Sequence, residues 1–446
     1  MDGGGQPPTL GGAPRLPFLA FWGGQTVSSL GTQISLVAVP LFAARSLGAG
    51  PMEMGFLASL EVLPYLLLAI PAGIVADRYD RRRVMIVCDL GRLVALLAIP
   101  LAFGLHAASM GLLYGVTAMV GALSAFFAVA SQAYLPQLLP GERLLQGFQR
   151  LELSEAGARV AGPTVAGAVV QAAGVAVAVV ADAVSYLVSA VALAMRGPLR
   201  SMQSDPDVRS EGALAGLRAI ARDRVLRDLA ISTAIFNLAT GIVLAELVLF
   251  ATSDLGLGPA EFGLLYGVGN VGFVVGALSV VRLERRLGAG RLLATAGVLG
   301  SLAIGCIAGA AVLGTVAFVA GRFLGAVASP LFNVTLVSLR QARTPDALRG
   351  RVNAAFRLVD WGSAPLGALL GGILGARLGL PTAMSIAAGI GAVSAAWIVR
   401  GPVPRLGWLQ PWDVALVAAG AEAGSVGLLP AGSVDATTPD LGRSVA

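Results

Sequence analysis

Residues 73–83 read Gly-Ile-Val-Ala-Asp-Arg-Tyr-Asp-Arg-Arg-Arg and connect two long apolar segments, residues 53–76 and 84–105. A helix needs about 20 mostly apolar residues to cross the hydrocarbon core of a bilayer, and both segments reach that length. The arginines between them mark a short loop, because charged side chains are costly inside the hydrocarbon. This stretch therefore predicts two transmembrane helices joined by a short basic loop.

The same alternation of apolar segments and polar connections continues through the chain. With the same length requirement, and with Gly, Pro and charge clusters as boundaries, we predict an all-α membrane protein of twelve transmembrane helices. The predicted helices cover residues 16–45, 53–76, 84–105, 109–134, 148–170, 173–195, 227–251, 258–281, 291–311, 315–338, 351–375 and 381–399. The residues before Arg15 lack the basic start and short apolar core of a cleavable signal, so we expect the first helix to be retained.

The composition excludes several other classes of protein. Hydrophobic residues make up 56% of the 446 positions and charged residues 13%, with a mean hydropathy of +0.80, values that a soluble domain of this length could not carry without exposing large apolar patches. All 31 basic residues are arginine, and a Walker A loop needs a lysine, so ATP hydrolysis by that route is excluded. Cys88 and Cys306 lie far apart in apolar segments, so we expect neither a disulfide nor a metal site.

The arginines gather in alternate loops, which predicts the orientation of the chain. Loops rich in arginine face the cytoplasm of a bacterial inner membrane, so both termini are expected there too. The net charge of +6 therefore indicates topology and not a nucleic-acid surface. The arginines concerned are Arg78, Arg81, Arg82 and Arg83, then Arg196, Arg200, Arg209, Arg218, Arg222 and Arg224, then Arg282, Arg285 and Arg286, and finally Arg340, Arg343, Arg349 and Arg351.

The spacing of helices and polar stretches divides the chain into five regions. They are a cytoplasmic N-terminal segment (1–15), an N-terminal six-helix bundle (16–196), a cytoplasmic central loop (197–226), a C-terminal six-helix bundle (227–400) and a cytoplasmic tail (401–446). The tail is rich in Ala, Gly and Ser, and we expect it to be disordered.

One part of the chain repeats. Residues 140–167 align with residues 345–372 at a constant shift of 205 residues, which places Glu155 on Asp360. Two parallel six-helix halves form one class of transporter fold, with the substrate path between them. We therefore predict two pseudo-symmetric bundles, with Glu155 and Asp360 at similar depth on opposite sides of the path.

The basic loop at residues 73–83 resembles the loop 2–3 signature of the major facilitator superfamily, in which a glycine, an aspartate four residues later and an arginine precede a basic cluster. Within that superfamily the chain is most similar to the bacterial exporters of drugs and of siderophores of the enterobactin type. The similarity covers nearly the whole chain except the tail. Further matching motifs are Leu63-Pro-Tyr, Gln132-Ala-Tyr-Leu-Pro, Ala161-Gly-Pro and Arg349-Gly-Arg-Val.

The resemblance implies that the basic loop latches the cytoplasmic side shut when the carrier faces outward. Gly73 would allow close helix approach, Asp77 would meet the positive N-terminal end of a neighbouring helix, and the arginines would pair with acids of the other half. An alternative is that the arginines only set the orientation. The predicted latch residues are Gly73, Asp77, Arg78, Arg81 and Arg82.

Acidic residues inside the predicted helices are candidates for proton coupling, because an ionisable group at membrane depth tends to be functional. Some have no opposite charge within a helical turn, which suits a group that loads and releases a proton. Others have an arginine one turn away, so their alternative role is a self-neutralised structural pair. The unpaired candidates are Glu61, Asp182 and Glu246, and the paired ones are Glu155 with Arg159 and Asp360 with Arg357. Asp89 and Arg92, nearer the interface, are expected to be structural.

The predicted substrate path is apolar with a few polar points, which suits an amphipathic compound better than a sugar. Any one of these polar residues has the alternative role of bridging helices. The candidates are Gln25, Gln33, Arg159, Asn237, Arg322, Asn333 and Arg357.

The resemblance and the residues together predict a monomeric, proton-coupled exporter of a drug-like compound or siderophore, with an ion gradient in place of a cofactor. The chain has Thr32 and Ala128 where relatives often carry acids, so its proton carriers would be other residues. The alternatives are an uptake carrier for a small metabolite and a transport-inactive membrane scaffold or sensor. We predict no enzyme, because the helices offer no Ser-His or metal-ligand constellation.

Overall fold

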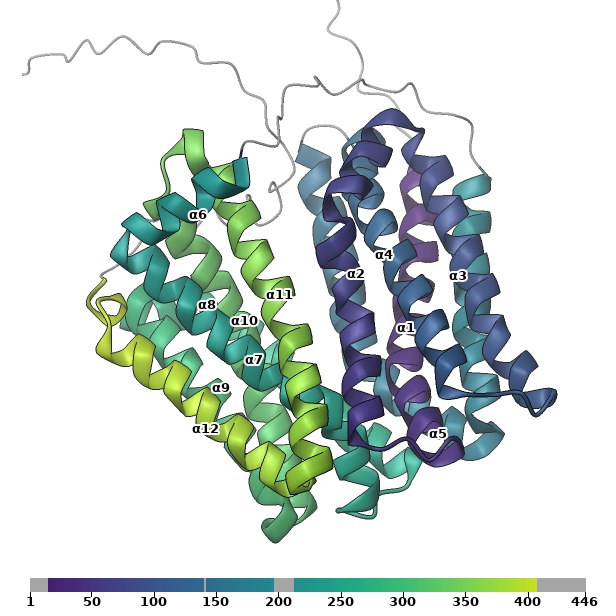
Figure 1. The fold of residues 1–446 in the computed structure, drawn as a ribbon. Helices are drawn as coiled ribbons and strands as arrows, with labels where there is room; N and C mark the ends of the chain where they lie inside the picture. The colour runs from purple at the N-terminus through teal and green to yellow at the C-terminus, as the bar shows by residue number, and fades with distance from the viewer. Residues whose placement is uncertain (1–14, 140–141, 196–211, 407–446) are drawn as a thin grey trace, which may run out of the picture.

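The computed structural model describes residues 15–139, 142–195 and 212–406, and within them the chain is almost entirely helical (Figure 1). The predicted N-terminal segment and nearly all of the tail lie outside the described residues. The helices are α1 (Arg15–Ser46), α2 (Pro51–Arg78), α3 (Arg81–Gly104), α4 (Met110–Leu138), α5 (Glu142–Ala194), α6 (Gly212–Arg222), α7 (Arg224–Ser253), α8 (Pro259–Leu287), α9 (Ala289–Leu313), α10 (Thr315–Arg343), α11 (Asp346–Leu378) and α12 (Leu380–Arg400), followed by a 3₁₀ turn η1 (Val403–Arg405).

Helix α5 turns back on itself at Gly174, whose φ of 83° is not helical. The segment before Gly174 runs in the same direction as α1, and the segment after it runs in the opposite direction. The contacts that establish these directions are Trp22 with Ser154 and Gln33 with Gly162 for the first segment, and Gln25 with Ser189 and Gly31 with Ser185 for the second. Element α5 therefore crosses the membrane twice.

Eleven of the described helices are long and apolar enough to cross a membrane. Since α5 counts twice, the described helices make twelve crossings, and the predicted fold class is confirmed. The exception is α6, which has eleven residues and lies in the stretch interpreted as the central loop. Its Ile220 packs in the same apolar cluster as Val352 and Phe356 of α11, so this connector is attached to the second bundle.

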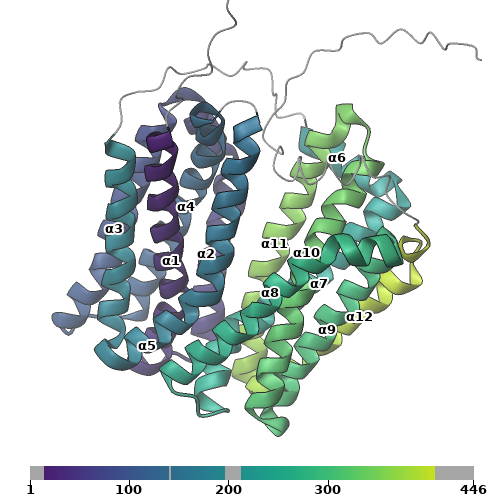
Figure 2. The ribbon, with the colours of Figure 1, turned by 180° about the vertical axis from the view of Figure 1, so that it is seen from behind.

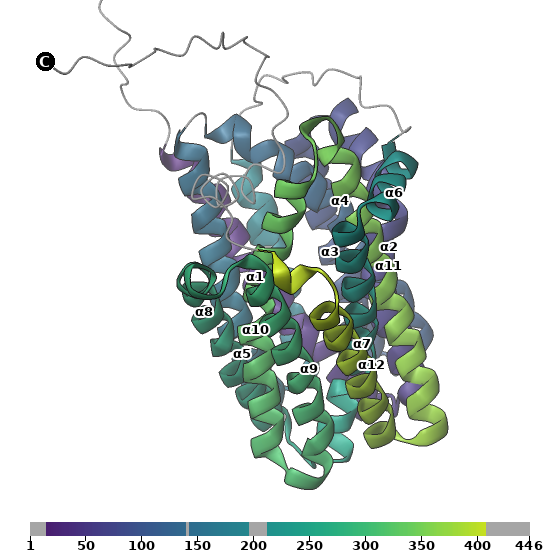
Figure 3. The same cartoon turned by 90° about the vertical axis from the view of Figure 1, so that its left-hand side faces the viewer.

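The crossings form two bundles, α1–α5 and α7–α12, which touch at one end and diverge toward the end that carries α6 (Figures 1 and 2). A view from the side shows α12 and η1 at the outer edge of the second bundle (Figure 3). The arginine pattern of the loops predicts that the diverging end faces the cytoplasm.

Two equivalent glycine pairs hold the bundles together at the touching end. A Cβ added to Gly55 of α2 would lie 2.8 Å from Cα of Gly372 in α11, and one added to Gly263 of α8 would lie 2.8 Å from Cα of Gly167 in α5. Such distances are too short for any side chain, so these backbones touch because both partners are glycine. Gly167 and Gly372, which the sequence repeat relates, thus make equivalent contacts with the opposite bundle.

A second repeat relates the starts of α2 and α8, at a shift of 208 residues. Both read Gly-x-Gly-Pro-x-Glu-x-Gly, from Gly48 and from Gly256, and these two glycines have φ values of 65° and 66°. In both, the glutamate accepts a hydrogen bond from the backbone N–H of the glycine three residues earlier, at 2.7 Å for Glu53 and 2.9 Å for Glu261. Each glutamate thereby caps the start of its helix. Gly55 and Gly263, which contact the other bundle, occupy the same position in the two motifs.

Candidate functional site

A cavity of about 560 Å³ lies between the two bundles, and its lining includes Met54 and Phe262, the chain neighbours of Gly55 and Gly263 at the touching end. Helices α1, α2, α3, α4 and α5 of the first bundle and α7, α8 and α11 of the second contribute to its wall. The wall is mainly aliphatic, with aromatic side chains from both bundles. Its aromatic residues are Tyr65, Tyr186, Phe262, Tyr266 and Trp361, and its polar ones are Thr32, Gln33, Ser35, Glu61, Thr117, Ser124 and Asp182.

Two aromatic side chains meet across the bundles at this cavity. The ring centroids of Tyr65 in α2 and Trp361 in α11 are 6.0 Å apart in an edge-on arrangement. Such a contact is favourable but small, on the order of 1 kcal/mol, so it can form and break during a conformational change.

Both carboxylates of the cavity wall come from the first bundle. Glu61 is exposed to the cavity, and no hydrogen bond or ion pair involves it among the described residues. Asp182 is only 1% exposed, and Oγ of Ser185 donates a hydrogen bond of 3.1 Å to its Oδ1. A carboxylate without a cationic partner at this depth is costly while charged, so each favours either a proton or a cationic ligand.

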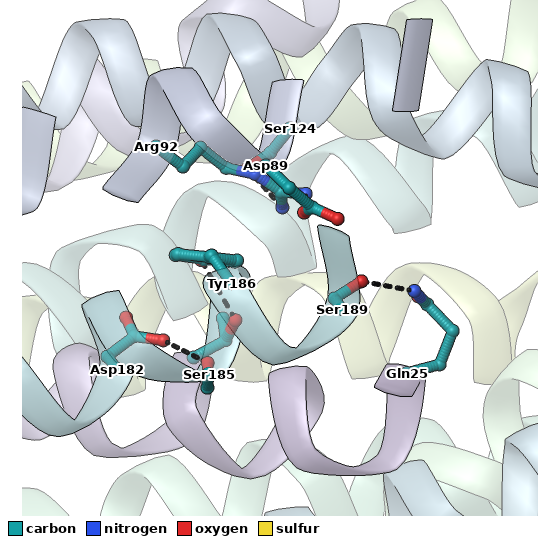
Figure 4. A network of polar contacts seen from close by, with 9 residues as sticks. Gln25, Asp89, Arg92, Ser124, Asp182, Ser185, Tyr186 and Ser189 are labelled. Atoms are coloured by element: carbon teal, nitrogen blue, oxygen red, sulfur yellow. Dashed lines mark hydrogen bonds and ion pairs between the residues drawn. The ribbon is translucent and has the colours of Figure 1, made fainter. Parts of the chain in front are cut away.

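A buried arginine lies directly behind this wall (Figure 4). Arg92 of α3 is paired with Asp89 one turn earlier, and its guanidinium lies 4.3 Å from the ring centroid of Tyr186 and 4.4 Å from that of Phe127. It also donates a hydrogen bond of 3.4 Å to Oγ of Ser124. Because Tyr186 and Ser124 both line the cavity, the charge of Arg92 is one side chain away from it.

The second bundle places a different arginine beside the cavity. Arg322 of α10 lies 3.8 Å from the ring centroid of Tyr266 and donates a hydrogen bond of 2.7 Å to Oδ1 of Asn270. Its Nε is buried without a hydrogen-bond partner, and no carboxylate pairs with it among the described residues. Asn270 in turn donates to the backbone oxygen of Arg159 in α5, at 2.7 Å, which links the two bundles.

The structure brings three of the predicted functional residues to the cavity wall. They are Glu61, Asp182 and Gln33. The other coupling and path candidates lie elsewhere, and their roles stay predictions. Gln25 donates to Ser189 within the first bundle, at 3.1 Å, and Asn333 to Ser329 within α10, at 3.3 Å.

Glu155 and Asp360, which the repeat relates, have different partners. Glu155 pairs with Arg159 on its own helix, as in the structural alternative. Asp360 accepts a hydrogen bond of 3.4 Å from Asn237, whereas Arg357 lies over the ring of Trp361 with its guanidinium 5.7 Å from the centroid. The expected symmetric pair of acids therefore has asymmetric surroundings.

Glu246 is the most deeply buried of the five acidic candidates. Its side chain is 0% exposed on α7, and neither carboxylate oxygen has a hydrogen-bond partner among the residues that the structure describes. Its neighbours Ala245 and Leu247 line the cavity, but Glu246 does not. Direct contact with a substrate in the cavity is therefore not possible in this conformation.

Two of the predicted latch arginines donate hydrogen bonds to backbone oxygens of the first bundle. Arg82 donates to the backbone oxygens of Leu193 and Ala194 at the end of α5, at 2.6 and 2.7 Å, and Arg81 to that of Ala133 in α4, at 2.9 Å. These bonds satisfy carbonyls at the C-terminal ends of helices.

The remaining latch residues lie at the diverging end. Arg78 and Asp77 are exposed, and no hydrogen bond or ion pair involves them in the described part of the chain. Instead of Asp77, Asp80 caps the start of α3 by accepting from the backbone N–H of Arg82 at 2.9 Å. A Cβ added to Gly73 would meet no other part of the protein within 4 Å, so in this conformation no helix packs closely against it.

Sequence reasoning assigned no substrate role to the aromatic residues and to the arginine behind the wall. Arg92 and Asp89 show the same signal as Glu155 and Arg159, opposite charges one turn apart in an apolar helix, and were interpreted as structural. No periodicity distinguishes Tyr186 or Trp361 from other aromatic residues, because only packing between distant helices brings them to one cavity.

The chain matches the transmembrane secretion effector family, one of the MFS-type transporter families, over residues 15–415. It belongs to this family. Among curated relatives, it is 27% identical over 359 residues to the multidrug efflux pump Tap of Mycobacterium tuberculosis, covering 77% of this chain and 83% of Tap. It is also 24% identical over 342 residues to the uncharacterized MFS-type transporter YfiS of Bacillus subtilis, covering 75% and 80%.

Solved transporter structures share the fold of this MFS protein. A bacterial homologue of the iron transporter ferroportin in its inward-facing state matches with a TM-score of 0.67 at 19% identity, covering 86% of this chain and 98% of the homologue. A structure described as the outward-facing state of such a homologue matches with a TM-score of 0.56 at 20% identity, covering 87% and 99%. The superfamily resemblance is thus confirmed, and the chain is a multi-pass membrane carrier and not an enzyme.

Proposed function

We propose that this carrier exports an amphipathic, drug-like compound, preferably a cation, in exchange for protons. The observation that carries the proposal is the cavity between the bundles, in which an aromatic and aliphatic wall faces two carboxylates, Glu61 and Asp182, that form no ion pair within the described part of the chain. Apolar surface would bind the body of the compound, and a carboxylate would bind either its positive charge or a proton.

Exchange follows if substrate and protons compete for Glu61 and Asp182. When both carboxylates are protonated the cavity offers no net negative charge, and a cationic compound is released. Deprotonation restores the charge and favours the compound again. Transport of one ligand against the other then needs no further cofactor, only a proton gradient across the membrane.

Alternating access is supported by the contacts between the bundles. They touch at the glycine pairs and diverge at the end predicted to be cytoplasmic, which describes an inward-facing carrier. The higher TM-score against the inward-facing ferroportin homologue is in keeping with this state. We infer that substrate enters from the cytoplasm, that the bundles then rock, and that the bacterial cytoplasmic membrane is the site of action.

Export is favoured over uptake by the relationship to Tap, a multidrug efflux pump. A siderophore remains within the proposed class, since such compounds are amphipathic, and we take the monomer as the working unit. Uptake of a small metabolite and a transport-inactive scaffold are the competing functions.

The test uses purified protein in proteoliposomes with a fluorescent lipophilic cation and an imposed proton gradient. We expect the cation to move against the proton flux, with a transport rate that collapses when the gradient is abolished by an ionophore. Movement of the cation together with protons would favour uptake. No substrate-dependent proton flux with a broad panel of compounds would favour the scaffold and contradict the proposal.

A further inference from the structure

A second cavity, of about 700 Å³, lies at the outer edge of the second bundle, away from the first bundle. It is lined by residues from the start of α7, the end of α12 and the turn η1, and Figure 3 shows α12 and η1 on this side of the bundle. Its lining residues include Arg224 and Arg227 of α7, Arg400 at the end of α12 and Arg405 of η1. This cavity, here called the arginine pocket, is separate from the substrate cavity in both position and lining.

The arginine pocket carries uncompensated positive charge. Its four arginines are exposed, and within the described residues none of their guanidinium groups takes part in a hydrogen bond or an ion pair. The one acid of the lining, Asp228, is 7% exposed, so three of the four positive charges have no counterpart in the wall. One guanidinium group can donate two parallel hydrogen bonds to two oxygens of a phosphate, so this set of arginines fits a phosphate group.

One side of the pocket is apolar. Val393, Ala396 and Trp397 of α12 line it together with the arginines, and Val393 and Trp397 are 55% and 43% exposed. Seven residues separate Val393 from Arg400, which is roughly 10 Å along a helix. Tryptophan is typical of the boundary between hydrocarbon and headgroups. The pocket therefore changes from charged to apolar over the distance that separates a lipid phosphate from its acyl chains.

We propose that the arginine pocket binds an anionic phospholipid, with the phosphate on Arg227 and Arg400 and an acyl chain along Val393 and Trp397. The predicted orientation places the pocket in the cytoplasmic leaflet, whose surface is negatively charged. The inference does not depend on the substrate or direction of transport, because it uses no residue of the substrate cavity.

The experiment measures retention of phosphatidylglycerol against phosphatidylcholine by the full-length protein. Protein released from nanodiscs of equal amounts of both lipids is examined by native mass spectrometry. We expect phosphatidylglycerol to be retained preferentially, and the preference to fall about tenfold in the double variant Arg227→Gln/Arg400→Gln. The matched control, Arg218→Gln/Arg222→Gln, removes two exposed arginines of α6 outside the pocket and should keep the wild-type preference.

Two further measurements distinguish the phosphate of a lipid from that of a soluble compound. Val393→Asn should weaken retention of phosphatidylglycerol by a few-fold, and glycerol phosphate in solution should not displace the lipid. Displacement by millimolar glycerol phosphate would instead indicate a site for a soluble anion and overturn the lipid assignment. Equal retention of both lipids, or an equal loss in both double variants, would also overturn it.

Discussion

The two walls of the cavity between the bundles differ in chemistry although the two bundles share a fold. The first bundle contributes both carboxylates and all the hydroxyl and amide side chains of the wall apart from tyrosine, whereas the second contributes only aliphatic, aromatic and glycine residues. Behind the first wall, Arg92 is paired with Asp89. Behind the second, Arg322 has an amide partner and no acid among the described residues.

The repeat explains how this difference is built. The shift of 208 residues that relates Pro51 to Pro259 places Glu61 on Gly269. A Cβ on Gly269 would lie 2.4 Å from Cβ of Arg322, so α10 packs directly where the first bundle exposes a carboxylate. The two halves therefore keep the same backbone contacts but differ in side-chain chemistry, and under the proposed function protons and a cation would bind to the first wall and the apolar body of the compound to the second.

The largest expected effect concerns the arginines behind the walls. Arg92→Gln should destabilise the fold by about 3 kcal/mol, because it leaves the carboxylate of Asp89 buried without its cationic partner. Arg322→Gln removes no partner from an acid and should cost about 1 kcal/mol. Thermal unfolding of both variants in the same detergent checks this order, and an equal loss of stability would show that the two arginines have equivalent surroundings.

The next effect concerns the carboxylates of the first wall. Glu61→Gln and Asp182→Asn should each lower proton-driven transport about tenfold and flatten its dependence on pH, because the exchanged proton has lost its site. Asp254→Asn, which removes an exposed acid at the end of α7, should keep the wild-type profile. Transport in proteoliposomes across a range of pH values is the measurement. If both cavity variants kept the wild-type dependence of transport on pH, Glu61 and Asp182 would not be the coupling residues.

The glycine pairs test the symmetry of the bundles themselves. Gly55→Ala and Gly263→Ala should disfavour the inward-facing state to the same extent, by about 1–2 kcal/mol, because each new Cβ would meet backbone of the other bundle. Gly73→Ala should leave this state unchanged, since nothing lies within 4 Å of its Cβ position. Distances between spin labels on α2 and α11 report the populations. A shift in only one of the two glycine variants would show that the contacts are not equivalent.

The smallest effect is expected in the second wall. Trp361→Ala should weaken substrate binding a few-fold through lost aromatic contact and leave the pH profile unchanged. Binding titrations with the fluorescent cation at two pH values measure both quantities. A changed pH profile in this variant would mean that the walls do not divide the chemistry as described.

Much of the fold could be predicted from the sequence, because apolar length is a local property. All twelve crossings were predicted, although the sequence did not show that 148–170 and 173–195 join at a single glycine, Gly174. The helix α6 was missed because its eleven residues are too short and too polar for a membrane-span criterion. The matching motifs that begin at Gly48 and Gly256 are a further sequence indication that the two halves are related.

The site was less predictable for a physical reason. Unpaired acids in apolar helices can be found by inspection, and Glu61 and Asp182 do line the cavity. Glu246 carries the same sequence signal and points elsewhere, since the rotation of a helix decides which side chains reach a cavity. The grouping of Tyr65, Tyr186 and Trp361 depends on packing between helices far apart in the chain.

The sequence by itself determined that this protein is a twelve-helix membrane carrier with two related halves. The length of each apolar segment, the positions of the arginines and the repeated motifs can all be identified in the sequence without knowledge of the packing. Only the tertiary structure decided which charges face the cavity, which are paired, and where the arginine pocket forms. These properties depend on contacts between helices, and such contacts are fixed by the packing of the bundles and not by any one segment.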